Sequence, residues 1–164
     1  MMKTEITTDL KLATFETKRE FLEDVPLVWR AWTEAELLDQ WWAPAPWKCE
    51  TKVMDFSEGG KWIYDMVGPA GERHGGIQLY ETIVFQDYFS GKDAFADHEG
   101  NINQDLPVCE WRNTFIKTEK GTLVVSFAQY PDQESLETVI KMGMAEGLTM
   151  AHNQLENVLI KLTR

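Results

Sequence analysis

The last part of the chain, residues 131–162, is a long amphipathic stretch that strongly limits the possible folds. Its apolar side chains recur at helical spacing and form one stripe. Acidic residues gather near its start, where they favour the positive end of a helix. A helix with one long apolar face must cover a sheet or other helices. We therefore expect a single long helix packed on a sheet, with this stripe as its buried face: Ile140, Met144, Leu148, Ala151, Leu155, Val158 and Leu162.

Two glycines, Gly143 and Gly147, lie beside that stripe. Each costs about 1 kcal/mol of helix propensity relative to alanine, so something should compensate. Either the helix approaches the sheet closely at this point, or the missing side chains leave room for a ligand. We expect residues 151–162 to pack conventionally and residues 142–150 to roof a pocket.

Between residues 10 and 130, most segments have the alternation and turn signals of strands. The predicted strands span residues 10–21, 47–56, 61–67, 74–83, 87–95, 108–118 and 122–130. Short turns join most of them, which favours antiparallel pairing. With the helices, this order predicts the α+β class, in a single domain spanning residues 1–164.

Two short helices are expected between the first two strands. Asp24 can cap the first, and Pro26 is tolerated in its first turn. Thr33 and Glu36 have the spacing of a capping box for the second. That second helix carries adjacent Trp41 and Trp42, which point about 100° apart, so one should enter the core and the other can close a pocket.

The charge and the cysteines restrict partners and location. A net charge of -11 repels phosphate backbones and anionic membranes, so we expect no nucleic-acid or membrane partner. The N-terminus has no apolar signal region, and no stretch is long enough to span a membrane. Cys49 and Cys109 match no zinc spacing and read as free thiols of a reducing compartment. We expect a cytoplasmic protein.

Metal and catalytic motifs are weak in this sequence. The polar loop over residues 96–107 alternates acids and amides as a calcium loop does, but its glycine is misplaced and no glutamate closes it. His74, His98 and His152 show no motif spacing, and phosphate loops and nucleophile elbows are missing from the sequence. We expect no cofactor and no metal, and read His74 as structural before catalytic.

Several short motifs, in order along nearly the whole chain, resemble one bacterial family. They run Val28-Trp29-Arg30-Ala31-Trp32-Thr33, Trp41-Trp42-Ala43-Pro44, Glu58-Gly59-Gly60-Lys61-Trp62, Met66-Val67-Gly68-Pro69, His74-Gly75 and Met142-Gly143-Met144-Ala145-Glu146-Gly147. The chain resembles proteins similar to the activator of heat-shock-protein-90 ATPase, in the START-like (SRPBCC) superfamily. This resemblance implies a helix-grip fold: a curved antiparallel sheet of about seven strands around the C-terminal helix, with a hydrophobic cavity between them.

An aromatic strand face is the strongest site signal. Trp62, Tyr64 and Met66 alternate on one strand and should share a face, because successive strand residues point to opposite sides. Aromatic walls with few polar groups are typical of small-molecule pockets, although they also describe a filled core. The predicted pocket comprises Trp42, Trp62, Tyr64, Met66, His74, Tyr88, Phe95, Trp111, Met142, Gly143, Gly147 and Met150.

Three functions are compatible with these features. The first, which we favour, is a module that binds a small apolar or amphipathic molecule, as a monomer or homodimer. The second is a co-chaperone, although the chain is too short for the separate chaperone-contact domain of the eukaryotic activator. The third is a cyclase or dehydratase with His74, Tyr64 or Arg112 as acid or donor. Arg112 could instead pair with Asp65 across the sheet.

Overall fold

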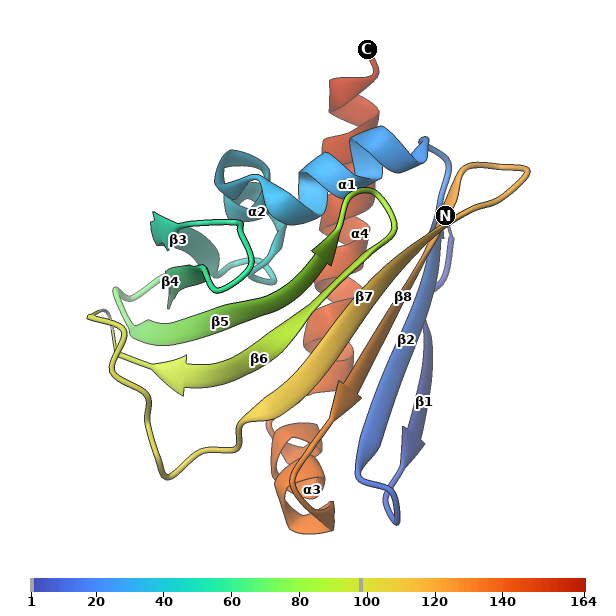
Figure 1. Ribbon diagram of the computed structural model, residues 1–164. Helices are drawn as coiled ribbons and strands as arrows, with labels where there is room; N and C mark the ends of the chain where they lie inside the picture. Colours follow the sequence, from blue (N-terminus) through green and yellow to red (C-terminus); the bar gives the residue numbers. More distant parts are fainter. Residues whose placement is uncertain (1, 98) are drawn as a thin grey trace.

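The computed structural model describes residues 2–97 and 99–164, which form eight strands and four helices (Figure 1). In chain order they are β1 (Glu5–Asp9), β2 (Thr14–Phe21), α1 (Val25–Thr33), α2 (Ala35–Trp41), β3 (Lys48–Met54), β4 (Lys61–Val67), β5 (Arg73–Val84), β6 (Tyr88–Ala96), β7 (Cys109–Lys117), β8 (Thr122–Gln129), α3 (Gln133–Lys141) and α4 (Met144–Leu162). In the described part of the chain, no helix is both long and apolar enough to cross a membrane.

All eight strands form one antiparallel sheet in the order β1-β2-β8-β7-β6-β5-β4-β3. One face of this sheet looks toward α4, which runs along it, while α1 and α2 cross one end and α3 lies at the other (Figure 1). The predicted α+β class and the predicted helix-grip arrangement are confirmed, with β1 as an additional edge strand paired to β2.

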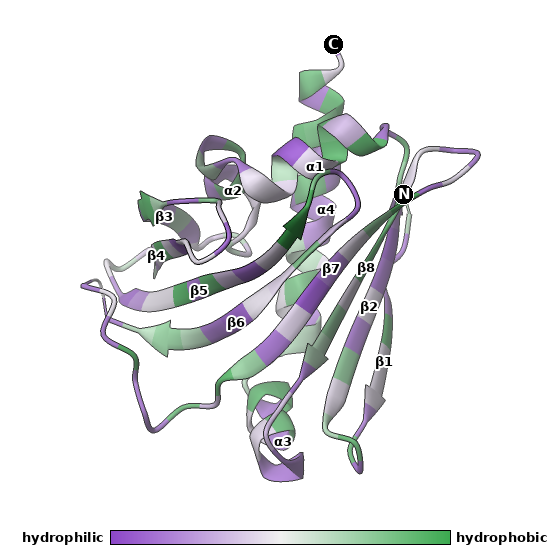
Figure 2. Ribbon diagram, viewed as in Figure 1, coloured by the Kyte–Doolittle hydropathy of each residue, from purple (hydrophilic) through white to green (hydrophobic). Residues whose placement is uncertain are grey.

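Strand alternation explains which side chains the sheet buries. On β7, Cys109, Trp111 and Phe115 are buried, whereas the intervening Glu110 and Arg112 are exposed. The same period of two appears as alternating hydropathy along the strands (Figure 2). Because successive side chains point to opposite faces, each inward residue is flanked by outward ones.

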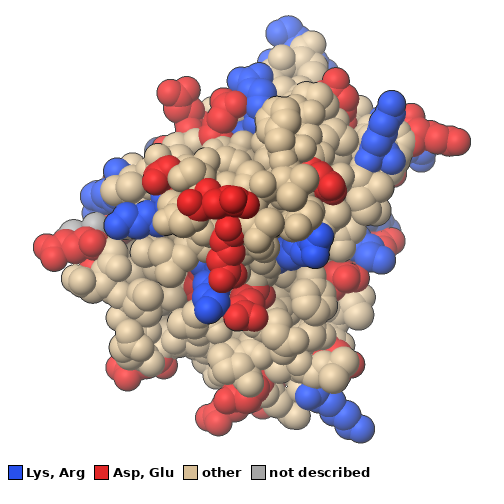
Figure 3. Space-filling view, in the orientation of Figure 1, with Lys and Arg blue, Asp and Glu red and all other residues tan. Residues whose placement is uncertain are grey.

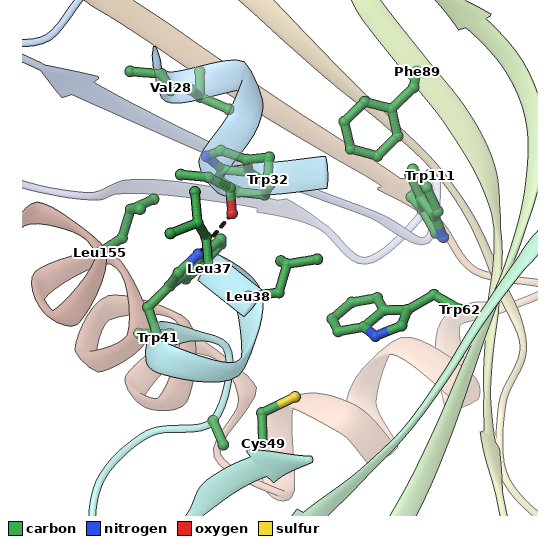
Figure 4. Packing of buried hydrophobic residues seen from close by; sticks show 14 of the residues in the cluster. Val28, Trp32, Leu37, Leu38, Trp41, Cys49, Trp62, Phe89, Trp111 and Leu155 are labelled. Carbon is green, nitrogen blue, oxygen red and sulfur yellow. Dashed lines mark hydrogen bonds between the residues drawn. The ribbon is translucent and has the colours of Figure 1, made fainter. Parts of the chain in front are cut away.

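The end of the sheet under α1 is a solid aromatic core. The Trp29 indole packs edge-on against Phe89 and Phe115, with ring centroids 5.5 and 5.0 Å apart. Trp41 is 1% exposed, and its indole N–H donates to the backbone oxygen of Ala31 at 2.9 Å, the bond drawn in Figure 4. This hydrogen bond satisfies the buried N–H and joins α2 to α1.

The prediction of one continuous C-terminal helix was wrong. The chain forms α3 and α4 with a break at Met142 and Gly143. Gly143 has φ +86°, a left-handed conformation that favours glycine because other residues clash there. The glycine that seemed to weaken one helix therefore separates two.

The N-terminal predictions were partly wrong. The expected strand over residues 10–21 begins only at Thr14, and Leu10 and Leu12 are exposed in the turn from β1. The Thr33 capping box does not form, because the Thr33 hydroxyl donates to the Trp29 carbonyl at 2.8 Å and Glu34, not Thr33, is the N-cap residue of α2. The Asp24 cap is confirmed, since its carboxylate accepts from the Leu27 N–H.

Candidate functional site

A cavity of about 370 Å³ lies between the sheet and the junction of α3 and α4. Its floor comes mainly from inward residues of β4 to β8, and its roof from residues 139–152 of the two helices. Trp42 and Pro44, just after α2, close part of its side. The volume is at the low end of the range of small-molecule sites, which is about 300–1,000 Å³.

Glycines help to keep the cavity open. Gly75 and Gly76 on β5 both line it. A Cβ on Gly76 would lie 2.5 Å from the Tyr64 ring, so that ring can lie flat across the sheet only because residue 76 is glycine. On the roof, a Cβ on Gly147 would meet only Pro44 Cγ, at 3.7 Å. The helix at Gly147 therefore does not press on the sheet, and the missing side chain leaves space beside the cavity.

Most of the residues predicted for the pocket do surround this cavity. Those that line it are Trp42, Tyr64, Met66, His74, Phe95, Trp111, Met142, Gly143 and Gly147. His74 and Met142 are exposed, which indicates that they lie at the cavity mouth. Whether these side chains contact a ligand stays a prediction.

Three predicted residues lie elsewhere. Trp62 is fully buried. Its ring stacks on that of Tyr64, and its indole N–H donates to the Thr51 hydroxyl at 3.0 Å. Tyr88 lies under the Arg112 guanidinium, whose carbon is 3.7 Å from the ring centroid. Met150 is 45% exposed, on the side of α4 away from the cavity lining.

The expected pairing of Asp65 with Arg112 does not occur. Asp65 is 1% exposed and accepts from the Arg73 guanidinium at 3.0 Å, on the neighbouring strand β5. Arg112 is exposed, and a residue between inward Trp111 and Asn113 must point to the outer face. Arg112 therefore cannot hold a ligand in this cavity, nor act there as an acid.

A row of polar side chains crosses the cavity floor. Strand register aligns Gln78 on β5 with Asp93 on β6, and Asp93 with Cys109 on β7. The Cys109 thiol donates to Asp93 Oδ1 at 2.7 Å. Tyr130, just past β8, lies on the other side of Cys109, and its hydroxyl donates to Met144 Sδ on the roof at 3.4 Å. All four residues line the cavity.

Asp93 is the most unusual member of this row. Burial raises the pKa of its carboxyl to about 6, although the thiol and the backbone N–H of Cys109 both favour the charged form. Asp93 is nevertheless only partly buried as a residue, and it lines the cavity. Burial, together with the nearby Asp93 charge, raises the pKa values of the Cys109 thiol and the Tyr130 hydroxyl, so both stay protonated near neutral pH.

A second polar group lies toward the packed end. Strand pairing brings Thr17, Ser126 and Asn113 side by side on β2, β8 and β7. Behind them, His152 on α4 is 2% exposed, and its Nδ1 lies 2.9 Å from the Thr4 hydroxyl. Burial, aided by the nearby Arg19, lowers the pKa of His152 to about 4, so it is neutral at pH 7.

Several buried donors around the cavity have no partner. The indole N–H groups of Trp32 and Trp111 and the hydroxyl of Ser126 make no hydrogen bond within the described residues. An unpaired buried donor costs about 1–3 kcal/mol, so such groups are rare without a reason. All three residues line the cavity, although the unpaired atoms themselves are buried.

The described residues contain no group of three or more His, Cys, Asp or Glu side chains that could hold a metal ion. Cys49 and Cys109 are both buried free thiols. Of the three histidines, His152 and His74 line the cavity, the latter with its ring 5.3 Å from that of Trp47. His98 lies outside the described residues.

Comparison with known proteins places the chain in a family. The model of the family described as "Activator of Hsp90 ATPase homolog 1-like protein" matches residues 24–159, from the cap of α1 to the last turn of α4. The chain belongs to this family. A search of the curated proteins found no match.

Solved structures of similar proteins share the whole fold. Protein Ms6760 from Mycobacterium smegmatis is 31% identical, with a TM-score of 0.89 over 96% of each chain. A protein from Arthrobacter aurescens is 29% identical, with a TM-score of 0.90 over 96% of this chain and 91% of that one. A protein from Rhodobacter sphaeroides, at 19% identity and a TM-score of 0.84, shows the same fold. These similarities support the family and the architecture.

Proposed function

We propose that this member of the family binds a small apolar or amphipathic molecule in the cavity between the sheet and α3–α4. The observation that carries the proposal is the cavity itself, about 370 Å³ in a domain whose other end is filled with interlocked aromatic rings. Protein interiors are normally packed as densely as organic crystals, so a void of this size in a small domain calls for an occupant.

The cavity lining also suits such a ligand. Aromatic and aliphatic side chains dominate it, among them Trp42, Tyr64, Trp111 and Leu148, and a few polar groups interrupt them. This combination provides apolar burial for affinity and polar contacts for orientation. We propose the cytoplasm as the location, because both cysteines are free thiols and a reducing compartment preserves them.

A neutral fluorescent dye tests the proposal directly. N-phenylnaphthylamine brightens when it enters an apolar site, so titration of the purified protein should show saturable binding. Displacement of the dye by small apolar compounds should follow, and native mass spectrometry should find one dye per chain. Dye fluorescence that does not saturate, together with no bound mass, would overturn the proposal.

Catalysis and chaperone activation are weaker candidates. Of the residues expected to act as acids or donors, His74 and Tyr64 line the cavity and Arg112 does not. Activation of a chaperone ATPase rests on the family description alone. Fold and family membership do not fix function, so ligand binding remains the function with direct geometric support.

A further inference from the structure

We propose that the natural ligand is an organic cation, an apolar body carrying one protonated amine that binds Asp93. This inference rests on the proposed function and specifies the chemistry of the occupant. It begins with the charges around the cavity. Among the described residues that line it, Asp93 is the one carboxylate, and no lysine or arginine is present.

The Asp93 carboxylate has unused acceptor positions. A carboxylate can accept about four hydrogen bonds. The donors that stabilise its charge both belong to Cys109, namely the thiol at 2.7 Å and the backbone N–H. Because Asp93 is only partly buried and lines the cavity, further donors can reach it from within the cavity.

Within the described residues, no ion pair supplies a counter-ion to an ionised Asp93. Burying a charge is costly unless an opposite charge pairs with it. Elsewhere in this protein the rule is obeyed, since buried Asp65 pairs with Arg73 at 3.0 Å and buried Arg19 pairs with Glu156 at 2.8 Å. Asp93 differs from both, and a ligand cation would supply what the lining does not.

The aromatic lining favours the same charge. Indole and phenol rings attract cations over their faces, tryptophan most strongly. Trp42, Trp111 and Tyr64 all line the cavity in which Asp93 lies. A fatty acid or another anionic ligand would meet a like charge and no cation among these residues, so the lining disfavours carboxylates.

The surface charge of the protein acts in the same direction over longer distances. The net charge is -11, and acidic side chains are spread over the face seen in Figure 3, with basic ones among them. Such a field raises the local concentration of cations and repels anions. This long-range field should increase the association rate of an amine, but it does not determine where in the protein the amine binds.

Three probes with one apolar body test the proposal: phenylbutylamine, phenylbutanol and phenylbutanoate. Calorimetric titration at about pH 8 keeps Asp93 ionised, because this is above the pKa of its carboxyl. We expect the amine to bind about tenfold tighter than the alcohol, with the carboxylate weakest, because a charge-assisted hydrogen bond is stronger than a neutral one.

Asp93→Asn removes the charge and keeps the shape, including an acceptor for the Cys109 thiol. The variant should lose the preference for the amine, with alcohol affinity changed by less than about twofold. Glu110→Gln is the matched control, since the exposed Glu110 on β7 lies next to Cys109 but points outward toward Lys92. That variant makes the same change in net charge and should keep the preference.

The outcomes separate this inference from the proposed function. If N-phenylnaphthylamine binds but the three probes bind equally, or the amine preference survives in Asp93→Asn, the cation proposal is overturned while the cavity proposal stands. Equal loss of preference in Asp93→Asn and Glu110→Gln would also overturn it, because the effect would then come from net charge. If the dye itself fails to bind, both proposals fall.

Discussion

The two halves of α4 share one apolar face but meet very different surroundings. Toward the C-terminus, Leu155 and Leu159 are 0% exposed and pack into the core beside α1 and α2. Toward the N-terminus, Gly147 and Leu148 are only partly buried and line the cavity. One half of the helix stabilises the fold, and the other half leaves space.

The difference comes from the residues facing the helix, more than from the helix itself. Opposite the packed half, the large rings of Trp32 and Trp41 fill the gap, with centroids 4.8 Å apart. Opposite the open half, the strands present Gly75 and Gly76 together with Asp93. Small and polar residues on the sheet therefore decide where the core ends and the cavity begins.

Truncation of equivalent leucines should show the largest contrast. Leu155→Ala should lower the free energy of unfolding by about 2–5 kcal/mol, because it leaves a new void in tight packing. Leu148→Ala should cost less than about 1 kcal/mol, because its side chain already borders empty space. Urea unfolding of both variants measures the contrast, and equal losses would show that the two halves are packed alike.

The next largest effect should come from Asp93 and should depend on pH. The pKa of its carboxyl is about 6 in the folded protein, against an ordinary value of 3.8. In the window between these two pH values, the folded protein keeps the Asp93 proton while the unfolded chain has released it. Stability is therefore lost as the pH rises through the window. Asp93→Asn should be more stable than the parent by about 1–3 kcal/mol near pH 8.

At about pH 3 that difference should nearly vanish, because this pH lies below both pKa values and Asp93 is then mostly protonated in both states. Comparing the two proteins cancels the opposite contribution of His152, whose lowered pKa makes stability fall as the pH drops below its ordinary value of 6.5. Urea titrations at both pH values test the prediction. A less stable variant near pH 8 would mean that Asp93 supports the fold instead of straining it.

The two helix glycines should respond to alanine with opposite signs. Gly143→Ala should cost about 1–2 kcal/mol, because φ +86° is strained for any residue with a Cβ. Gly147→Ala should add about 0.5–1 kcal/mol, because it raises helix propensity and its Cβ meets only Pro44. Thermal melts suffice, and destabilisation by both would indicate close packing along the whole segment.

Much of this molecule follows from local sequence patterns. Alternation placed every strand from β3 to β8 within a few residues, and the spacing of Leu155 and Val158 identified the packed half of α4. The helix break escaped prediction because apolar spacing continues through residues 142–143. Gly143 was noticed, but its backbone conformation depends on the tertiary arrangement of α3 and α4.

The polar part of the cavity was missed although a signal existed. Phe89, Gly91, Asp93 and Phe95 alternate along β6, so Asp93 shares the face of Phe95, which was predicted to face the pocket. The predicted pocket contained aromatic residues, methionines, glycines and a histidine, and no carboxylate. The same alternation places Tyr88 on the opposite face from Phe95, and the register shows that the face of Phe95 is the inward one.

A leucine at position 147 tests the central claim most directly. Gly147→Leu should extend into the cavity and lower the affinity for N-phenylnaphthylamine by at least about tenfold, while stability changes by less than about 1 kcal/mol. Met150→Leu, on the exposed side of the same helix, is the matched control and should leave dye binding unchanged. A Gly147→Leu protein that unfolds, or one that binds the dye as the parent does, would contradict a ligand cavity under this half of α4.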